Sequence, residues 1–403
     1  MFKCRACNSS SVESIIGLGK LPLANALLSS IEQVKEARHN LEVMLCGDCG
    51  LAQLRDLVDP KELFSNYVYF SSNSDTMLKS AKELVERIIP TLPKDAYIIE
   101  VASNDGYLLK NYINNNINAL GIDPAKNIAK IANDNGIPTL NDFFSEDLAT
   151  KLASEGKKAD IIHANNVFAH VPDIKGFIKG VKLLLKPHGK AVIEVPYFLD
   201  LVEKLEFDTI YHEHVFYFSI KPLKKVFERY GLELFDIEET KLHGGTVRLY
   251  IGHTDAHNVS SIVTEMIKKE EDANLYNHDT FVKFMNRVNQ LKQDLNHLIS
   301  KLKNNGARIA AYGASAKGTT LLNYFGLDRT HLDFVVDRSP VKQGLFTPGT
   351  HIKIMDPSSL VNENISHALL LTWNFADEIR QQQQEFINRG GKFIIPLPEA
   401  YVV

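Results

Sequence analysis

Two stretches of this chain alternate short apolar runs with segments of helical character, and this alternation constrains the fold more than any other feature. The first stretch contains "AYIIEV", "NALGI", "ADIIHA" and "GKAVIEV", and the second contains "RIAAYG", "LDFVVD", "HALLL" and "GKFIIPLP". Strands that alternate with helices in this way predict a doubly wound, mostly parallel sheet. The sequence therefore predicts two α/β units, and ligands in such sheets bind beyond the carboxyl ends of the strands.

The composition is that of an ordinary globular protein, and it argues against two classes of partner. Of the 403 residues, 44% are apolar and 23% are charged, and the net charge of -4 provides no basic field for nucleic acid. No run of about 18 apolar residues is present, as a membrane span would need. The opening "MFKCRACNSS" lacks the apolar core of a signal peptide. We therefore expect a cytoplasmic protein that binds neither nucleic acid nor membranes.

The only four cysteines form two pairs with CxxC spacing, Cys4 with Cys7 and Cys46 with Cys49. Each pair is a tight turn that can present two thiolates to one tetrahedral ion, and four thiolates leave no coordination position for water or substrate. In a reducing compartment, such pairs favour a metal over disulfides. The sequence therefore predicts a structural zinc ion.

These patterns divide the chain into four segments. The cysteine module occupies residues 1–65, and the first α/β unit, with a helical linker before it, occupies residues 66–253. Apolar residues at helical spacing predict a bridge over residues 254–305. The second α/β unit occupies residues 306–403.

The stretch "IEVASNDGYLL" lies where a nucleotide-binding turn follows the first strand of the first α/β unit. A dinucleotide fingerprint GxGxxG needs three glycines, and only Gly106 is present here. Glu100 would repel a pyrophosphate but suits a cationic sulfonium ligand, and Asp123 ends the second strand where it can accept hydrogen bonds from a ribose. These features favour S-adenosylmethionine over a dinucleotide. The residues predicted to bind it are Glu100, Ser103, Asn104, Gly106, Asp123, Asn165 and Asn166.

The stretch "IYHEHVFYFS" places four polar groups, from Tyr211 to His214, inside an apolar and aromatic run. Taken alone, it is compatible with a metal site, a proton-transfer site or the polar edge of a sheet. His170, in the loop "NNVFAHVPD" after a predicted strand, faces the same predicted cleft.

Seven segments in order carry a resemblance to a known family. They are the paired CxxC module, "YFSSNSDTM", "EVASNDGYLL", "NNVFAHVPD", "YHEH", "HGGTVR" and "YGASAKGTT". The chain resembles the S-adenosylmethionine-dependent C-methyltransferases that act on nucleoside-diphosphate 4-keto-6-deoxy sugars, over nearly its whole length. The resemblance implies a zinc-binding amino-terminal domain, a central Rossmann-like class I methyltransferase domain and a carboxyl-terminal Rossmann-like domain that helps to hold the nucleotide sugar.

The resemblance also implies a reaction, methylation at C3 of a dTDP-linked sugar in deoxysugar biosynthesis. Deprotonation beside the ketone gives an enolate, so the enzyme needs a base and donors for the enolate oxygen. By similarity, His214 is the general base, Glu213 orients a histidine or stabilises its charged form, and Tyr211 donates to the sugar or enolate oxygen. His170 polarises the ketone or positions a hydroxyl, whereas we expect His212 to be structural.

Further residues are predicted to contact the nucleotide sugar. Tyr67 or Tyr69 would close the pocket, and "KLHGGTVR" would form a wall near the sugar or phosphates. A glycine-rich helix start in "GASAKG" would bind the diphosphate. The predicted substrate-binding residues are Tyr67, Tyr69, His243, Gly244, Arg248, Gly313, Ser315 and Lys317. Two residues depart from the family pattern: Ala102 replaces a usual glycine, and Thr246 replaces an expected serine.

Three alternatives remain open from the sequence. "HEH" could hold a metal if its two imidazoles lie on one face of a strand, although no HExxH pattern is present. A nicotinamide-dependent oxidoreductase would need the missing glycines. A zinc-ribbon methyltransferase could instead act on RNA, protein or another small molecule, although the near-neutral charge and the lack of a basic aromatic patch disfavour RNA. A non-catalytic scaffold would not need these ionisable groups. The sequence leaves open whether the protein is a monomer or a homodimer.

Overall fold

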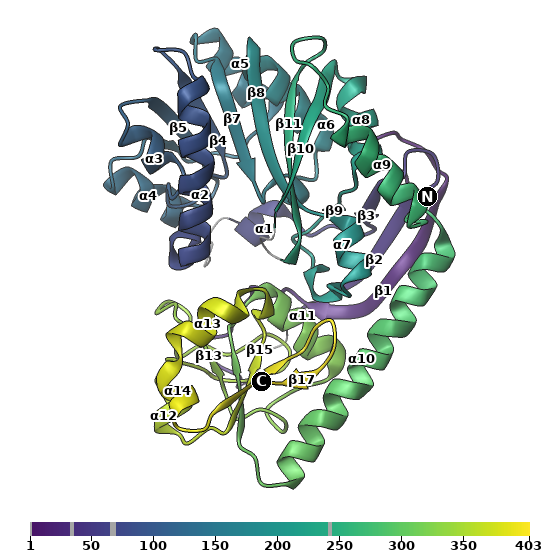
Figure 1. Ribbon diagram of the computed structural model, residues 1–403, viewed down its shortest axis with the longest axis vertical. Coiled ribbons are helices and arrows are strands. Elements are labelled where there is room, and N and C mark those ends of the chain that lie inside the picture. Colours follow the sequence, from purple (N-terminus) through teal and green to yellow (C-terminus); the bar gives the residue numbers. More distant parts are fainter. Residues whose placement is uncertain (1, 33–35, 65–69, 241–243) are drawn as a thin grey trace.

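The computed structural model describes residues 2–32, 36–64, 70–240 and 244–403, and these form three bodies, each built on its own sheet. Figure 1 shows the central body above the carboxyl-terminal body, with the amino-terminal sheet and a long helix along one side. In the described part of the chain, no helix is long and apolar enough to cross a membrane.

The amino-terminal sheet is antiparallel and has the order β1-β2-β3-β9. Its strands are β1 (Val12–Pro22), β2 (Arg38–Cys46), β3 (Ala52–Leu54) and β9 (Phe216–Tyr217). The fourth strand comes from more than 150 residues later in the chain than the third. A segment of the central body therefore completes the sheet of the cysteine module.

The central sheet has seven strands in the order β10-β11-β8-β7-β4-β5-β6. The run from β8 to β6 is parallel, whereas β11 and β10 are antiparallel to their neighbours. Its strands are β4 (Tyr97–Val101), β5 (Asn118–Ile122), β6 (Thr139–Leu140), β7 (Ala159–Asn165), β8 (Leu185–Pro196), β10 (Leu232–Thr240) and β11 (Thr246–His253). The parallel strands are buried on both faces, as is typical of sheets covered by helices.

The helices before and within the central body lie between these strands or flank them. They are α1 (Pro60–Phe64), α2 (Asp75–Ile88), α3 (Leu109–Ile113), α4 (Lys126–Asp134), α5 (Glu146–Ser154), α6 (Ile174–Leu184), α7 (Phe198–Glu203) and α8 (Ile220–Arg229). Short 3-10 turns occur at η1 (Ser71–Asn73), η2 (Ile89–Thr91), η3 (Phe168–His170) and η4 (Phe207–Thr209).

The carboxyl-terminal sheet has the order β14-β13-β12-β15-β16-β17, and only β17 pairs antiparallel. Its strands are β12 (Ile309–Tyr312), β13 (Val335–Val336), β14 (Ile354–Met355), β15 (His367–Leu370), β16 (Lys392–Ile395) and β17 (Tyr401–Val402). Its helices are α11 (Ala316–Phe325), α12 (Ser359–Asn362), η6 (Trp373–Phe375), α13 (Ala376–Gln382) and α14 (Gln384–Asn388). The predicted fold class, two α/β units behind a small cysteine-bearing domain, is confirmed.

Two helices, α9 (Ile262–Asp272) and α10 (His278–Asn304), connect the two α/β bodies. The side chain of Asn277 caps α10, and Asp279 in the first turn and Lys303 in the last turn suit the helix dipole. One face of α10 is apolar at intervals of three, four or seven residues: Phe281, Phe284, Val288, Leu291, Leu295 and Ile299 are all buried. The helix runs beside β1 and down to the carboxyl-terminal body (Figure 1).

Candidate active site and metal centre

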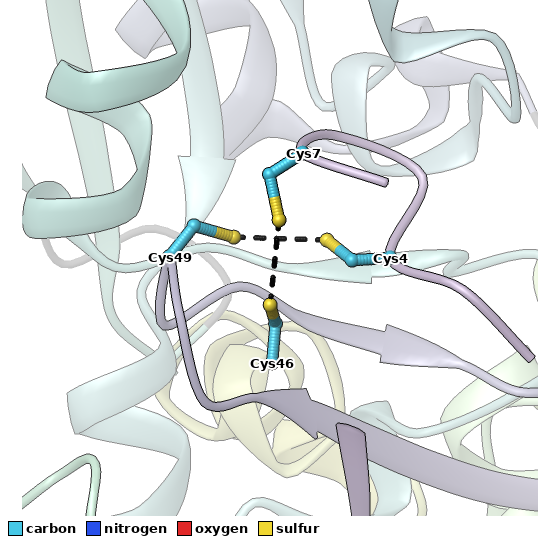
Figure 2. Close-up of side chains that lie close together, drawn as sticks. All are labelled: Cys4, Cys7, Cys46 and Cys49. Atoms are coloured by element: carbon cyan, nitrogen blue, oxygen red, sulfur yellow. Dashed lines mark hydrogen bonds between the residues drawn. The ribbon is translucent and has the colours of Figure 1, made fainter. Parts of the chain in front are cut away.

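The four cysteines come together, as their spacing predicted. Cys4 Sγ lies 3.6 Å from Cys49 Sγ, and Cys7 Sγ lies 3.5 Å from Cys46 Sγ. All four sulfur atoms lie within 4.8 Å of one another and point toward a common centre (Figure 2). A tetrahedral ion with metal–sulfur bonds of about 2.3 Å requires sulfur atoms about 3.8 Å apart. The four thiols therefore fit one zinc-sized ion and leave no ligand position open.

A cavity of about 610 Å³ lies between the central and carboxyl-terminal bodies. One wall consists of the carboxyl ends of β4, β5 and β7 with the loops that follow them. The opposite wall comes from the loop before α11, the segment 337–342 and the turn η6 with α13. The stretch around Tyr211 and His214 closes one side. A ligand bound at these strand ends, as the alternation of strands and helices predicts, would thus lie opposite residues of the carboxyl-terminal body.

The turn after β4 has the backbone of a ligand-binding loop. Ala102 and Asn104 have φ angles of 54° and 50°, in the left-handed region where glycine is favoured. Gly106 has φ 80°, and a Cβ there would lie 2.3 Å from Ile137 Cδ1, so glycine is required at this position. Ala102 thus adopts the geometry of the glycine it replaces, at an energetic cost.

Three acidic side chains meet at this turn. Asp123 accepts hydrogen bonds from the N–H groups of Asn104 and Ala125, each at 2.9 Å, and burial raises its pKa to about 6. Burial, with Asp123 and Asp105 close by, raises the pKa of Glu100 well above its usual range. None of the described residues offers a partner to Glu100 Oε2 or Asp105 Oδ1. Of the three, only Asp123 lines the cavity. Its carboxylate fits a ligand that brings hydrogen-bond donors, as S-adenosylmethionine does.

The predicted cofactor residues divide into two groups. Asn104, Asp123, Asn165 and Asn166 line the cavity. Glu100, Ser103 and Gly106 do not: they lie beneath the turn and support it. Ser103, for instance, is fully buried and packs against Gly121 of the neighbouring strand.

Tyr211 and His214 form a hydrogen-bonded pair at the cavity. His214 Nδ1 donates to the carbonyl of Thr209 at 2.9 Å, because a carbonyl can only accept. In the neutral ring, Nε2 then carries the lone pair, and it lies 2.8 Å from the Tyr211 hydroxyl, which donates to it. The backbone therefore selects the tautomer in which His214 Nε2 can take up a proton.

His170 packs edge-on against His214, with ring centroids 4.7 Å apart. Burial lowers the pKa of His170 to about 4, so this ring is neutral near pH 7. Glu213 accepts a hydrogen bond of 2.7 Å from Asn25 of the amino-terminal domain.

His212 turns away from the cavity, and its Nε2 donates to the carbonyl of His39 at 3.1 Å. Residues 211–213 form a bend and a turn. The alternative of a strand with both imidazoles on one face is therefore wrong, and among the described residues only the four cysteines cluster as metal ligands.

The carboxyl-terminal wall contains three of the predicted substrate residues, Gly313, Ser315 and Lys317. Gly313 has φ 97°, and Ser315 caps α11 by accepting from the N–H of Gly318 at 3.1 Å. The ammonium of Lys317 lies 4.7 Å from the centre of the Trp373 ring.

Two of the other predicted substrate residues, Arg248 and Gly244, are not on the cavity wall. Arg248 is 3% exposed inside the central sheet, between Glu194 and Glu238, so its guanidinium is not part of the cavity wall. Gly244 lies outside the cavity wall, close to the carboxyl group of Glu206. Tyr67, Tyr69 and His243 lie outside the described residues.

Several residues that join the two bodies near the cavity escaped the sequence analysis. Trp373 Nε1 donates to Asp208 at 2.8 Å, which joins the two bodies beside Lys317. Glu378 of the cavity wall accepts from the Thr76 hydroxyl of the central body at 2.6 Å. Only one sequence signal pointed to any of them: Asp208 lies just before "YHEH". Contacts between residues some 300 positions apart leave no local pattern.

Comparisons with known proteins agree with this arrangement. A family described as a methyltransferase domain matches residues 75–237, and one described as a C-methyltransferase C-terminal domain matches residues 241–398. A family of zinc-binding domains matches residues 4–64 and so includes all four cysteines.

Solved methyltransferase structures resemble part of the chain. Magnesium protoporphyrin IX methyltransferase from Synechocystis PCC 6803, with bound S-adenosylmethionine, is 12% identical, with 44% of this chain and 79% of that chain covered and a TM-score of 0.34. An S-adenosylmethionine-dependent methyltransferase from Clostridium acetobutylicum is 13% identical, with 44% and 92% covered and a TM-score of 0.35.

A full-length relative determines the family. The C-methyltransferase NovU of Streptomyces niveus is 32% identical over 405 residues, which cover 100% of this chain and 96% of the relative. The motifs had predicted this relationship, and the chain belongs to the family of S-adenosylmethionine-dependent C-methyltransferases.

Proposed function

We propose that the protein transfers a methyl group from S-adenosylmethionine to C3 of a dTDP-linked 4-keto-6-deoxy sugar through an enolate. The Tyr211–His214 pair is the observation that carries this proposal. It places a basic nitrogen and a hydroxyl donor on the cavity that the cofactor strands also line. Methylation at a carbon beside a ketone needs these groups, whereas methylation of an oxygen needs no enolate.

On the cofactor side, Asp123 would accept hydrogen bonds from the ribose, and the acidic groups beneath the turn would favour the cationic end. When bound, S-adenosylmethionine supplies an electrophilic methyl group. The protein's own residues then have to generate a carbanion equivalent on the sugar and exclude water from it.

His214 would take the proton at Nε2 as the carbon–hydrogen bond breaks, and the electron pair would move toward the ketone oxygen. The Thr209 carbonyl favours the imidazolium that forms, because a hydrogen bond from the charged ring is stronger than one from the neutral ring. Tyr211 lies at the same nitrogen, and its hydroxyl would leave Nε2 as the nitrogen takes up the proton. The hydroxyl would then donate to the developing enolate oxygen. The low pKa of His170 makes it a weak base and suits it to positioning a sugar hydroxyl.

The opposite wall would hold the nucleotide. The start of α11 presents backbone N–H groups, with Lys317 beside them, and such a site suits a diphosphate. In the amino-terminal domain, the four thiolates would hold a structural zinc ion.

The test is incubation with S-adenosylmethionine and dTDP-4-keto-6-deoxyglucose, followed by mass spectrometry of the nucleotide sugar. We expect replacement of one hydrogen by one methyl group, and deuterium uptake beside the ketone in heavy water. A dTDP sugar without the ketone is the matched control and should gain nothing. Methylation of the control, or exchange that survives His214→Asn, would contradict the enolate route.

A further inference from the structure

A row of alternating charges crosses the central sheet and ends at the cavity. Arg87 of α2 makes two hydrogen bonds of 3.0 Å to Glu238 of β10. Arg248 of β11 bonds Glu238 at 2.7 Å and Glu194 of β8 at 2.9 Å. Glu194 Oε1 in turn accepts from Asn166 Nδ2 at 2.9 Å. The row thus leads from an exposed helix to a residue of the cavity wall.

The strand register creates this row. Arg248 is the cross-strand partner of both Glu238 and Glu194, and Glu194 is the partner of Asn165. Directly opposed residues present their side chains on the same face of a sheet, so the three charged groups meet. Glu194 and Arg248 have side chains only 2% and 3% exposed. Two carboxylates occupy the ends of the Arg248 guanidinium, which leaves it no role as a phosphate ligand.

Glu194 holds Asn166 in an unusual conformation. Asn166 has φ 55°, and its backbone N–H donates to the carbonyl of Glu194 at 2.8 Å while its side chain donates to the carboxylate. Because a carboxylate only accepts, the amide nitrogen of Asn166 must face Glu194. Oδ1 then points the other way, and none of the described residues gives it a partner.

We propose that Glu194 and Arg248 are positioning residues for the cofactor. Glu194 fixes Asn166, and with it the loop from Asn165 to His170, as the wall against which S-adenosylmethionine binds. Arg248, which bonds the Glu194 carboxylate, holds it in place. The inference rests on S-adenosylmethionine as the cofactor and is independent of the sugar. Nothing in the sequence distinguishes Arg248 from a ligand-binding arginine. The strand register, which places it opposite Glu238 and Glu194, does make that distinction.

The test measures binding of S-adenosylhomocysteine to the full-length protein by calorimetry, with thermal unfolding of every variant alongside. The pair E194M/R248M removes both charges and the acceptor for Asn166. The pair E194Q/R248M also removes both charges but keeps an acceptor oxygen. Since both pairs avoid an unpaired buried charge, each should fold. R87Q, which removes only the exposed outer partner, is the control.

We expect the Kd of E194M/R248M to rise about tenfold, the effect of one lost hydrogen bond. N166A should cause the same rise and add nothing in the E194M/R248M background. E194Q/R248M and R87Q should bind like the unmodified protein. Unchanged affinity in folded E194M/R248M would overturn this inference and leave the cofactor assignment intact. Absence of binding by the unmodified protein would overturn it together with the cofactor assignment.

Discussion

The Tyr211→Phe substitution separates the chemical role of the Tyr211–His214 pair from its structural one. Phenylalanine keeps the ring that lies 4.1 Å, centroid to centroid, from the His214 imidazole. It removes only the hydroxyl that donates to His214 Nε2 at 2.8 Å. The packing of the loop is therefore preserved, and any effect on rate reports the hydroxyl.

The two roles predict effects of different size. Loss of one neutral hydrogen bond should lower the free energy of unfolding by about 1 kcal/mol. Loss of a donor to a developing enolate oxygen should cost ~2.7–4 kcal/mol in the transition state, which is a fall of about 10²–10³ in kcat. A rate effect that exceeds the stability effect would place the hydroxyl in the chemistry.

Deuterium exchange at the carbon beside the ketone is the appropriate assay, because it isolates deprotonation from methyl transfer. It is measured in heavy water by mass spectrometry of the nucleotide sugar, with urea unfolding of the same preparations. Tyr324→Phe is the matched control: its hydroxyl bonds Asn289 at 3.1 Å on the surface. If the exchange rate of Tyr211→Phe stays within about threefold of the unmodified protein, the hydroxyl does not stabilise the enolate.

Four further predictions concern other parts of the molecule. Ala102→Gly should raise the free energy of unfolding by ~1 kcal/mol in urea titrations, because φ 54° strains alanine and not glycine; a loss of stability would contradict this. The pKa of Asp123 is about 6, and the carboxylate is the form that accepts hydrogen bonds. The affinity for S-adenosylhomocysteine should therefore fall as the pH drops below 6. Calorimetry at about pH 5, 6, 7 and 8 should show this dependence in the unmodified protein and not in Asp123→Asn. Chelation of the metal should abolish hydrogen-exchange protection in β2 and β3, and zinc should restore it; protection that persists would refute a metal-dependent fold. Trp373 is the sole tryptophan and lies against Lys317, so binding of dTDP should change the intrinsic fluorescence. A dTDP titration followed by this fluorescence should show an affinity about tenfold weaker in Lys317→Met. The control Lys292→Met, whose ammonium lies over Tyr324, should bind dTDP like the unmodified protein.

The sequence predicted the features that depend on short spacing. CxxC pairs bring two thiols together within one turn, so the metal ligands required no knowledge of the fold. Strand ends in a parallel sheet share one edge, so Asp123, Asn165 and His170 were expected on one cleft, and all three line it. The CxxC spacing was sufficient to predict the cysteine cluster, and the alternation of strands and helices was sufficient to predict the shared cleft.

The misplaced residues depend on which strands become neighbours. Arg248 lies in a motif next to two glycines, and that context suggested a ligand contact. Its partners Glu194 and Glu238 come from strands on either side of β11, and an antiparallel insertion decides that arrangement. The contact of Thr76 with Glu378 likewise needs the position of one body against the other. Neither the sheet order nor that packing has a local signature.

The loop that carries His214 is linked through the backbone to the cysteine module. Immediately after His214, Val215 donates to the carbonyl of Ala169 at 2.7 Å and accepts from Leu54 N–H at 2.8 Å. The next residues form β9 and pair with β3, where Gln53 donates to Cys4 Sγ at 3.2 Å. The cysteine cluster and His214, the proposed general base, are thus joined through one strand pairing. An ion held by the four cysteines would in this way help to determine where His214 lies relative to His170. On the proposed mechanism, loss of that ion should slow deprotonation before the central sheet unfolds.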